Sequence, residues 1–409
     1  MKIHGRVDSS SLISPDCGIA ERDMRYQITE DQSMILDSLK AFLEKEIYPY
    51  EAEADRTGNV SVDMGEDIKR KAIEMGFYAM NLPESVGGGG LDYTSLGLVE
   101  RELGKASYGL AGHIARPTEI LLACEGEQID KYLLPCITGE KHESFALTEP
   151  GAGSDIMSMA TKAVSDGDDW VINGAKHFIS TPCVPDFTIV FVVTGMDETP
   201  RGPRKRVTAF LVDKGEKGFD IQLGPTCVSQ RCYRTYQLSF DDVRVHKSHI
   251  LGEEGKGLEL ADKWLSMGRV WVGAQCCGKM ELLLELATEW AATRKQFGKT
   301  IGRFQGTSFK LADMATELQA SDLLVMHACQ MADQGKMTSQ DAAMAKLFGS
   351  EALGRAADNA VQIYGGMGLM EDLPIQRLWR DARIERIWDG TSEIQRHIIS
   401  RTLLREYEA

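Results

Sequence analysis

The chain has 409 residues, enough to bury a large core and to divide into two or three domains. Its hydrophobic content of 43% and charged content of 26% are those of an ordinary soluble globular protein. The net charge of −15 argues against general binding to nucleic acid or to an anionic membrane, so an anionic ligand has to meet a local basic cluster.

The cysteines and the first residues bear on the compartment. The nine cysteines include no Cys-x-x-Cys pair, and Cys276 and Cys277 are adjacent within a helical pattern. This usage predicts reduced thiols in a cytoplasmic protein instead of disulfides or zinc ligands. Residues 1–25 carry several acidic side chains and no long apolar run, which argues against a secretory or transit peptide. No stretch is long enough to span a membrane.

Residues 1–25 are interpreted as an extension, and residues 26–140 as an N-terminal helical domain. Its first helix is expected to begin at Thr29, because Thr29 and Gln32 have the spacing of a capping box, and to end before Pro49. The helical pattern returns over residues 68–76, 96–122 and 129–134. A run of glycines at 87–90 is a loop, and without a phosphate-loop lysine its use as a nucleotide site is the weaker interpretation.

The pattern changes near residue 140. Runs of β type at 188–193, 207–212 and 236–240, separated by Gly, Asp and Pro, predict an antiparallel β domain over residues 141–255. Residues 256–409 return to long helical patterns, with breaks expected near Gly302, near Gly335 and at 365–366. The predicted fold class is therefore α+β and mainly α, with a central β domain between two helical domains.

A carboxylate stands on a predicted tight turn near the end of the chain. Asp389 and Gly390 precede a stretch in which Ser392 and Gln395 have the spacing of a capping box, so a helix is expected to begin there. A carboxylate beside the N–H groups of a helix start suits acid–base chemistry on a bound substrate. The plainer interpretation is a polar turn residue before a capped helix.

Residues 145–155 read Phe-Ala-Leu-Thr-Glu-Pro-Gly-Ala-Gly-Ser-Asp. Such a loop exposes backbone N–H groups and hydroxyls that can line a planar or phosphorylated ligand, although an ordinary polar loop has the same composition. The segment resembles the signature of the acyl-CoA dehydrogenase family of flavoproteins. The resemblance continues in the family's order through residues 174–180, 294–299, 362–366 and 388–393, and it covers about residues 26–405.

The resemblance implies an FAD enzyme with a C-terminal four-helix bundle, assembled as a homotetramer or homodimer. The residues implied to contact the FAD of their own subunit are Phe145, Leu147, Thr148, Gly153, Ser154, Phe178, Ser180, Thr391 and Glu393. Those implied to reach the FAD of a neighbouring subunit are Arg294, Gln296, Phe297, Gln362 and Gly366. Ser154 would also lie near the CoA. Arg294 can hold a pyrophosphate with two N–H groups, whereas without the resemblance it reads as a solvated charge.

The implied reaction is the α,β-desaturation of an acyl-CoA thioester. Asp389 falls at the position of the family's base and would take the α-proton while the β-hydride passes to flavin N5. Arg269 and Gly390 are predicted to lie beside the substrate, and an electron-transfer flavoprotein is the expected acceptor.

Asp389 also departs from the family, most of which has Glu there. Aspartate is shorter by about 1.5 Å, and a misplacement of about 1 Å can cost about a hundredfold in rate. Some relatives carry the base on the helix that matches residues 266–270, where this chain has Gly268 beside Arg269, so Asp389 is the one candidate. Aspartate at this position is a feature of relatives such as nitroalkane oxidase and of members that act on branched or hydroxylated acyl-CoAs.

Two more departures concern the substrate. Residues 227–236 replace a family segment that contacts CoA, with Arg231 and Arg234 as candidates for the anionic groups. His113 and Arg116 lie where a plain acyl chain predicts apolar residues. Arg116 either pairs with a polar or carboxylated acyl tail or faces solvent or another subunit.

The acyl group is therefore expected to be branched, cyclic, polar or dicarboxylic. The alternatives are a flavin oxidase acting on a non-CoA substrate such as a nitroalkane, an enoyl-CoA reductase that uses the same site, and a flavin-binding protein without catalysis.

Overall fold

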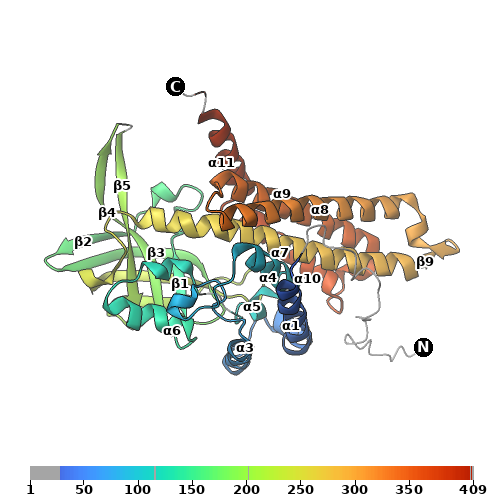
Figure 1. The fold of residues 1–409 in the computed structure, drawn as a ribbon, viewed down its shortest axis with the longest axis horizontal. Helices are drawn as coiled ribbons and strands as arrows, with labels where there is room; N and C mark the ends of the chain where they lie inside the picture. The colour runs from blue at the N-terminus through green and yellow to red at the C-terminus, as the bar shows by residue number, and fades with distance from the viewer. Residues whose placement is uncertain (1–27, 115–116, 201, 406, 408–409) are drawn as a thin grey trace.

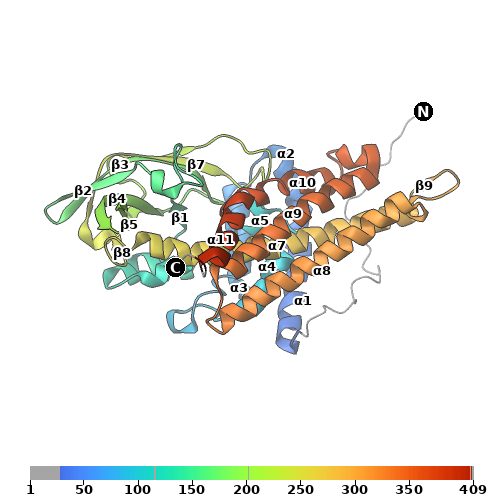
Figure 2. The same ribbon diagram turned by 90° about the horizontal axis from the view of Figure 1, so that it is seen from above.

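The computed structural model describes residues 28–114, 117–200, 202–405 and 407. The predicted extension 1–25 and Arg116 lie outside these residues. A β sheet occupies one end of the molecule and helices occupy the rest, as both views show (Figures 1 and 2). The long helix α7 (Gly257–Thr293) runs from the sheet to the opposite end of the molecule (Figure 1).

The first part of the described chain is helical. Its elements are α1 (Glu30–Glu46), α2 (Glu51–Thr57), α3 (Val62–Glu74), α4 (Tyr93–Leu103), α5 (Tyr108–Ala111) and α6 (Leu134–Ile137). The capping box at the start of α1 is confirmed, because the Thr29 hydroxyl accepts from the Gln32 N–H and the Gln32 side chain accepts from the Thr29 N–H.

The prediction of continuous helix over residues 96–122 is wrong. α4 ends at Leu103, and only α5 and a 3-10 turn, Glu119–Ala123, follow. The reason is the close crossing with α7: a Cβ added to Gly104 would lie 2.4 Å from the carbonyl oxygen of Gln275. The chain therefore turns away where it meets α7.

The central region is one sheet of eight strands in the order β6-β7-β3-β2-β4-β5-β8, with β1 also paired to β4. The strands are β1 (Glu143–Ala146), β2 (Lys162–Asp166), β3 (Asp169–Ser180), β4 (Phe187–Thr199), β5 (Gly202–Asp213), β6 (Phe219–Leu223), β7 (Thr235–His246) and β8 (Ile250–Leu251). The predicted antiparallel arrangement holds for most neighbours, but β4 pairs in parallel with β1 and β2. Both faces of β4 are covered, so Phe187 to Val192 are all buried.

The last part is again helical, with α7, α8 (Gln305–Asp333), α9 (Ser339–Tyr364), α10 (Pro374–Asp381) and α11 (Ser392–Arg405). The expected breaks are confirmed, and the first of them contains a small hairpin of β9 (Lys295–Gln296) and β10 (Lys299–Thr300). Small residues let the helices approach closely, since a Cβ on Gly273 of α7 would lie 3.1 Å from the Ala345 carbonyl oxygen of α9.

The predicted fold class is confirmed: the protein is mainly helical, with a central sheet between helical regions. The eight cysteines in the described part of the chain are free thiols. Across the described ranges, no helix has both the length and the apolar character that crossing a membrane requires.

Candidate active site

Asp389 lies in the turn between the 3-10 turn Ile384–Arg386 and the first residue of α11. Its φ is 53°, and that of the following Gly390 is 94°. Two successive residues in the left-handed region reverse the chain sharply, and an aspartate tolerates that region better than most residues. The surrounding side chains must hold such a conformation in place.

The carbonyl oxygens of this turn are held by side chains from three helices. Gln395 Nε2 donates to the oxygens of Asp389 at 3.2 Å and Gly390 at 2.8 Å. Lys346 Nζ, from α9, donates to the Gly390 oxygen at 2.9 Å, and Arg269 Nε, from α7, donates to the Asp389 oxygen at 3.3 Å. Two cations and an amide therefore fix the turn through its backbone.

The carboxylate of Asp389 reaches α7 at Gly268. A Cβ built on Gly268 would lie 3.4 Å from Asp389 Oδ2, so the missing side chain leaves room beside this oxygen. Burial lowers the pKa of Lys346 and of Arg269, and the negative charge of Asp389 opposes both shifts. The three charges are thus electrostatically coupled.

The capping box predicted for Ser392 and Gln395 is wrong, although α11 does begin at Ser392. Thr391 Oγ1 accepts from the Ile394 N–H at 3.4 Å, and Ser392 donates to Glu351. The Gln395 amide is instead used on the carbonyls of the Asp389 turn, which have no partners inside a helix.

The predicted FAD ligands Thr391 and Glu393 lie together at the start of α11. Hydrogen bonds from the backbone N–H of Glu393 and from the Thr391 hydroxyl lower the pKa of the Glu393 carboxyl. Their side chains are therefore already in contact in this chain.

The turn is also anchored on its other side. Trp388 Nε1 donates to Glu385 Oε2 at 2.8 Å, and Lys279 Nζ of α7 donates to Glu385 Oε1 at 3.0 Å. Both members of this ion pair are buried. The residues that support the turn were missed from the sequence, although a lysine within an alanine-rich helical stretch, as at 346, is a usable signal.

The loop at 145–155 is held by a buried ion pair that the sequence did not reveal. Glu149 accepts from the N–H groups of Ala160 at 2.6 Å and Thr161 at 3.0 Å and from Lys176 Nζ at 2.8 Å. Burial raises the pKa of Glu149, but these hydrogen bonds and the Lys176 charge outweigh it and lower the pKa. Lys176 Nζ also donates to the Leu147 oxygen at 3.0 Å, which fixes the start of the loop.

The predicted flavin contacts in this region fall into exposed and covered groups. Gly153 and Ser154 are exposed, and no atom lies within 4 Å of a Cβ built on Gly153. Thr148 is half-buried, and Leu147 is buried. The half-buried Phe145 stacks on Trp264 of α7, with ring centroids 4.3 Å apart.

Phe178 and Ser180 lie at the end of β3. Phe178 has a φ of 57° at an irregularity in the pairing with β7, and 62% of its surface is exposed. Ser180 is exposed, and its carbonyl oxygen accepts from the Tyr233 hydroxyl at 3.0 Å. The irregularity therefore turns a large aromatic ring outward beside the loop's side of the sheet.

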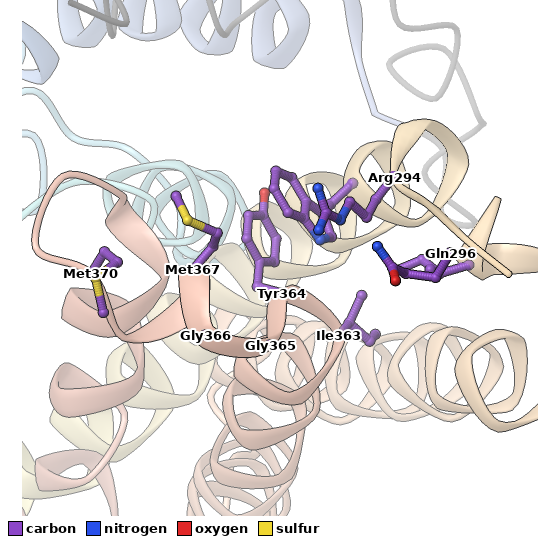
Figure 3. Close-up of a pocket in the computed structure, with 10 residues that line it drawn as sticks. Arg294, Gln296, Ile363, Tyr364, Gly365, Gly366, Met367 and Met370 are labelled. Atoms are coloured by element: carbon purple, nitrogen blue, oxygen red, sulfur yellow. The ribbon is translucent and has the colours of Figure 1, made fainter. Parts of the chain in front are cut away.

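The residues predicted to reach a neighbouring subunit lie at the other end of α7. Figure 3 shows a pocket there with Arg294, Gln296 and Gly366 on its wall, and its volume is about 560 Å³. Trp290 and Tyr364 stack at 4.7 Å within it. Gln362 is exposed beside this pocket, and Phe297 is 92% exposed in the β9–β10 hairpin. One chain therefore does not bring the two predicted sets of FAD contacts together.

The polar residues expected near the acyl group are in part accounted for. His113 is buried against Gly65 of α3, and burial lowers its pKa to about 4. Arg234 donates to the Asn59 side chain, and Arg231 is half-buried.

Three aromatic side chains meet beside Asp389, and none of them was predicted. The Tyr108 ring lies edge-to-face with Tyr233 at 4.7 Å and with Trp388 at 5.4 Å. They come from α5, from the segment between β6 and β7, and from the Asp389 turn.

Comparison with known proteins gives this arrangement its family. Three domain descriptions match: "Acyl-CoA dehydrogenase, N-terminal domain" over residues 29–140, "middle domain" over 144–243 and "C-terminal domain" over 255–404.

Curated relatives and solved structures agree. The chain is 38% identical to the 3-(aryl)acrylate reductase of Clostridium sporogenes, over 92% of this chain and 99% of that protein. It is 36% identical to the caffeyl-CoA reductase-Etf complex subunit CarC of Acetobacterium woodii, over 92% and 99%. The butyryl-CoA dehydrogenase structure from Megasphaera elsdenii superposes with a TM-score of 0.84 at 34% identity, covering 93% of this chain and 100% of that one.

These matches define a class, the flavin-dependent oxidoreductases that act on thioesters. The chain belongs to the acyl-CoA dehydrogenase family, whose members are FAD-dependent enzymes acting on acyl-CoA. The residues present fit FAD, because nothing lies within 4 Å of a Cβ on Gly365 or Gly366 and the Arg294 guanidinium stands over the Trp290 ring in the same pocket. The predictions of the family and of the cofactor are confirmed.

Proposed function

We propose that this enzyme catalyses the α,β-desaturation of an acyl-CoA thioester with Asp389 as the base. The observation that carries the proposal is the Asp389 turn. Its backbone is fixed by Arg269, Lys346 and Gln395, while its carboxylate is directed at the open space beside Gly268. A base held in one position converts its binding energy into proton transfer most effectively.

In this mechanism the chain supplies three things. The Asp389 backbone N–H donates to the thioester carbonyl, which acidifies the α C–H bond. The carboxylate then takes the α-proton and holds it on its oxygen, and the buried cations Lys346 and Arg269 favour its ionised form beforehand. Bound FAD accepts the β-hydride at N5, so that the two electrons of the broken C–H bond leave the substrate as the C=C bond forms.

The acceptor and the assembly are part of the proposal. An electron-transferring flavoprotein is the acceptor that relatives support, since one is named as a subunit of a reductase-Etf complex and one similar structure is titled for an electron transferring flavoprotein. A homo-oligomer, tetramer or dimer, is supported by the exposed Phe297 and by the pocket around Arg294, which would receive the FAD of a neighbouring subunit.

A second candidate is the reverse reaction, reduction of an enoyl-CoA. The observation that favours it is the pair of relatives named as reductases, one of an aryl acrylate and one of caffeyl-CoA. The same residues serve both directions, because Asp389 then delivers a proton to the α carbon instead of taking one.

The test is the anaerobic flavin absorbance of the holoenzyme during titration with straight, branched, alicyclic, aryl and dicarboxylic acyl-CoAs. We expect one class to bleach the flavin, and we expect Asp389→Asn to keep its FAD and lose the bleaching. Asp313→Asn, an exposed residue of α8, is the matched control and should behave like the unaltered enzyme. Reoxidation of the dithionite-reduced enzyme by enoyl-CoAs measures the reverse direction.

Two results would contradict the proposal. If the Asp389→Asn enzyme bleaches as fast as the unaltered one, Asp389 is not the base. If no acyl-CoA bleaches the flavin while a nitroalkane does and hydrogen peroxide accumulates, the enzyme is an oxidase of a non-CoA substrate.

A further inference from the structure

The aromatic group Tyr108, Tyr233 and Trp388 joins the three parts of the chain at the proposed base. Tyr108 stands between the other two, at 4.7 Å and an interplanar angle of 86° from Tyr233 and at 5.4 Å and 60° from Trp388. Both contacts are in the range at which edge-to-face pairs are favourable, so the rings fix one another's planes. All three side chains remain partly accessible.

The polar ends of two of these rings are engaged by the protein. The Tyr233 hydroxyl donates to the Ser180 carbonyl oxygen at 3.0 Å, and Trp388 Nε1 donates to Glu385 at 2.8 Å. Because Glu385 is in turn paired with the buried Lys279, the indole ring cannot rotate without breaking this network. The accessible part of these side chains is therefore mainly the ring carbon.

Their position relates them to the acyl group. Trp388 directly precedes Asp389, so its Cα lies about 3.8 Å from that of the residue proposed to take the α-proton. Tyr233 is bonded to Ser180, one of the residues predicted to cover the flavin ring. A substituent on the β carbon, between base and flavin, comes within reach of this aromatic group.

We infer that Tyr108, Tyr233 and Trp388 form a contact surface that selects acyl-CoAs with a planar, aryl substituent on the β carbon. The inference rests on the proposed function and narrows its substrate class. An aliphatic chain gains only area from these rings, whereas an aryl group also gains the electrostatic preference of one ring for the edge or the offset face of another. That preference corresponds to about a two- to twelvefold change in affinity.

The test compares two thioesters that differ only in the ring, 3-phenylpropionyl-CoA and 3-cyclohexylpropionyl-CoA. Their Kd values are measured by calorimetry on the Asp389→Asn holoenzyme, where no turnover occurs, and their kcat/KM values on the enzyme with Asp389. We expect the phenyl compound to be preferred by about two- to twelvefold. Tyr108→Leu should abolish the preference, and Tyr108→Phe, which keeps the ring, should retain it.

The control is Tyr50→Leu, a tyrosine that is 40% exposed in the 3-10 turn after α1. It should leave the ratio unchanged. Equal affinity and equal turnover of the two thioesters in the unaltered enzyme would overturn the inference and leave the desaturation proposal intact, and this comparison does not depend on whether a variant folds. If neither these thioesters nor any other acyl-CoA binds or bleaches the flavin, the proposed function fails together with the inference.

Discussion

The two turns at the centre of this enzyme, around Glu149 and around Asp389, are fixed by buried charges of opposite sign. In the first, a carboxylate collects two backbone N–H groups and a lysine. In the second, a lysine, an arginine and an amide collect two backbone carbonyls. A turn held by its carboxylate spends that group on structure, whereas a turn held by its carbonyls can direct a carboxylate at a substrate. The sign of the supporting charge thus distinguishes the structural acid from the proposed catalytic one.

The largest expected effect comes from Glu149→Gln. Removal of this carboxylate leaves the buried Lys176 without its counter-charge, and breaking such a pair costs about 3–5 kcal/mol. Urea unfolding should show that loss, accompanied by a reduced FAD content. The control is Asp168→Asn, which breaks an exposed pair with Lys247 and should cost less than about 1 kcal/mol. Equal losses in the two variants would show that Glu149 has no special structural role.

Lys346→Met tests the other turn. It removes the donor to the Gly390 oxygen and a buried cation near Asp389, so we expect a fall in kcat of about a hundredfold from a base displaced by about 1 Å. Arg269 and Glu385 also act on this region, and with Lys346 gone the remaining field favours the ionised carboxylate less. The acid limb of the kcat/KM profile should therefore move to higher pH.

The control for this variant is Lys310→Met on α8, whose Nζ donates to Asn359. It should leave both the rate and the pH profile unchanged. A Lys346→Met enzyme that loses rate with no movement of the acid limb would indicate a purely structural lysine.

His113 provides a third case, an ionisable group buried without a counter-charge in its hydrogen-bonding shell. Burial lowers its pKa from 6.5 to about 4, so the unfolded chain takes up the proton first as the pH falls. Stability is therefore lost between pH 6.5 and 4, by about 2 kcal/mol at pH 5 from this group.

The measurement is the difference in unfolding free energy between pH 7 and pH 5. His113→Gln should reduce that difference by the same amount, whereas His397→Gln on the exposed face of α11 should not. An unchanged difference in the His113 variant would mean that the imidazole is already protonated in the folded enzyme.

The smallest effect is expected for Gln395→Met. It removes the donors to both carbonyls of the Asp389 turn, but Lys346 and Arg269 still hold one oxygen each. Loss of about one net hydrogen bond corresponds to about a fivefold fall in kcat/KM. Steady-state kinetics would check this, and a loss as large as that of Lys346→Met would refute the view that the cations dominate.

Local patterns in the sequence predicted much of this molecule. The capping box at Thr29, the β runs and the glycine breaks depend on neighbouring residues, and each was found where it was expected. The Asp389 turn and the start of α11 were predicted for the same reason. The end of α4 was not, because it is set by contact with Gln275 of α7, which is far away in the sequence.

The supports of the site were out of reach for a similar reason. Lys346 bonds to Gly390 and Lys279 to Glu385, partners separated by 44 and 106 residues. Gln395 has the spacing of a capping residue but is used on carbonyls of the preceding turn, a choice that only the assembled site explains. Tyr108, Tyr233 and Trp388 look like ordinary aromatic residues until the three parts of the chain come together.

Gly268 gives the enzyme an adjustable working pH. An alanine there would place its methyl group 3.4 Å from Asp389 Oδ2, an ordinary contact that needs no rearrangement but excludes water from that side of the carboxylate. Less hydration disfavours the charged form, so the optimum would move upward in pH with the base unchanged. Larger side chains would compete with the carboxylate for the same volume. Position 268 is therefore a point at which one methyl group can retune the enzyme, and where evolution or an engineer can trade basicity against space for the substrate.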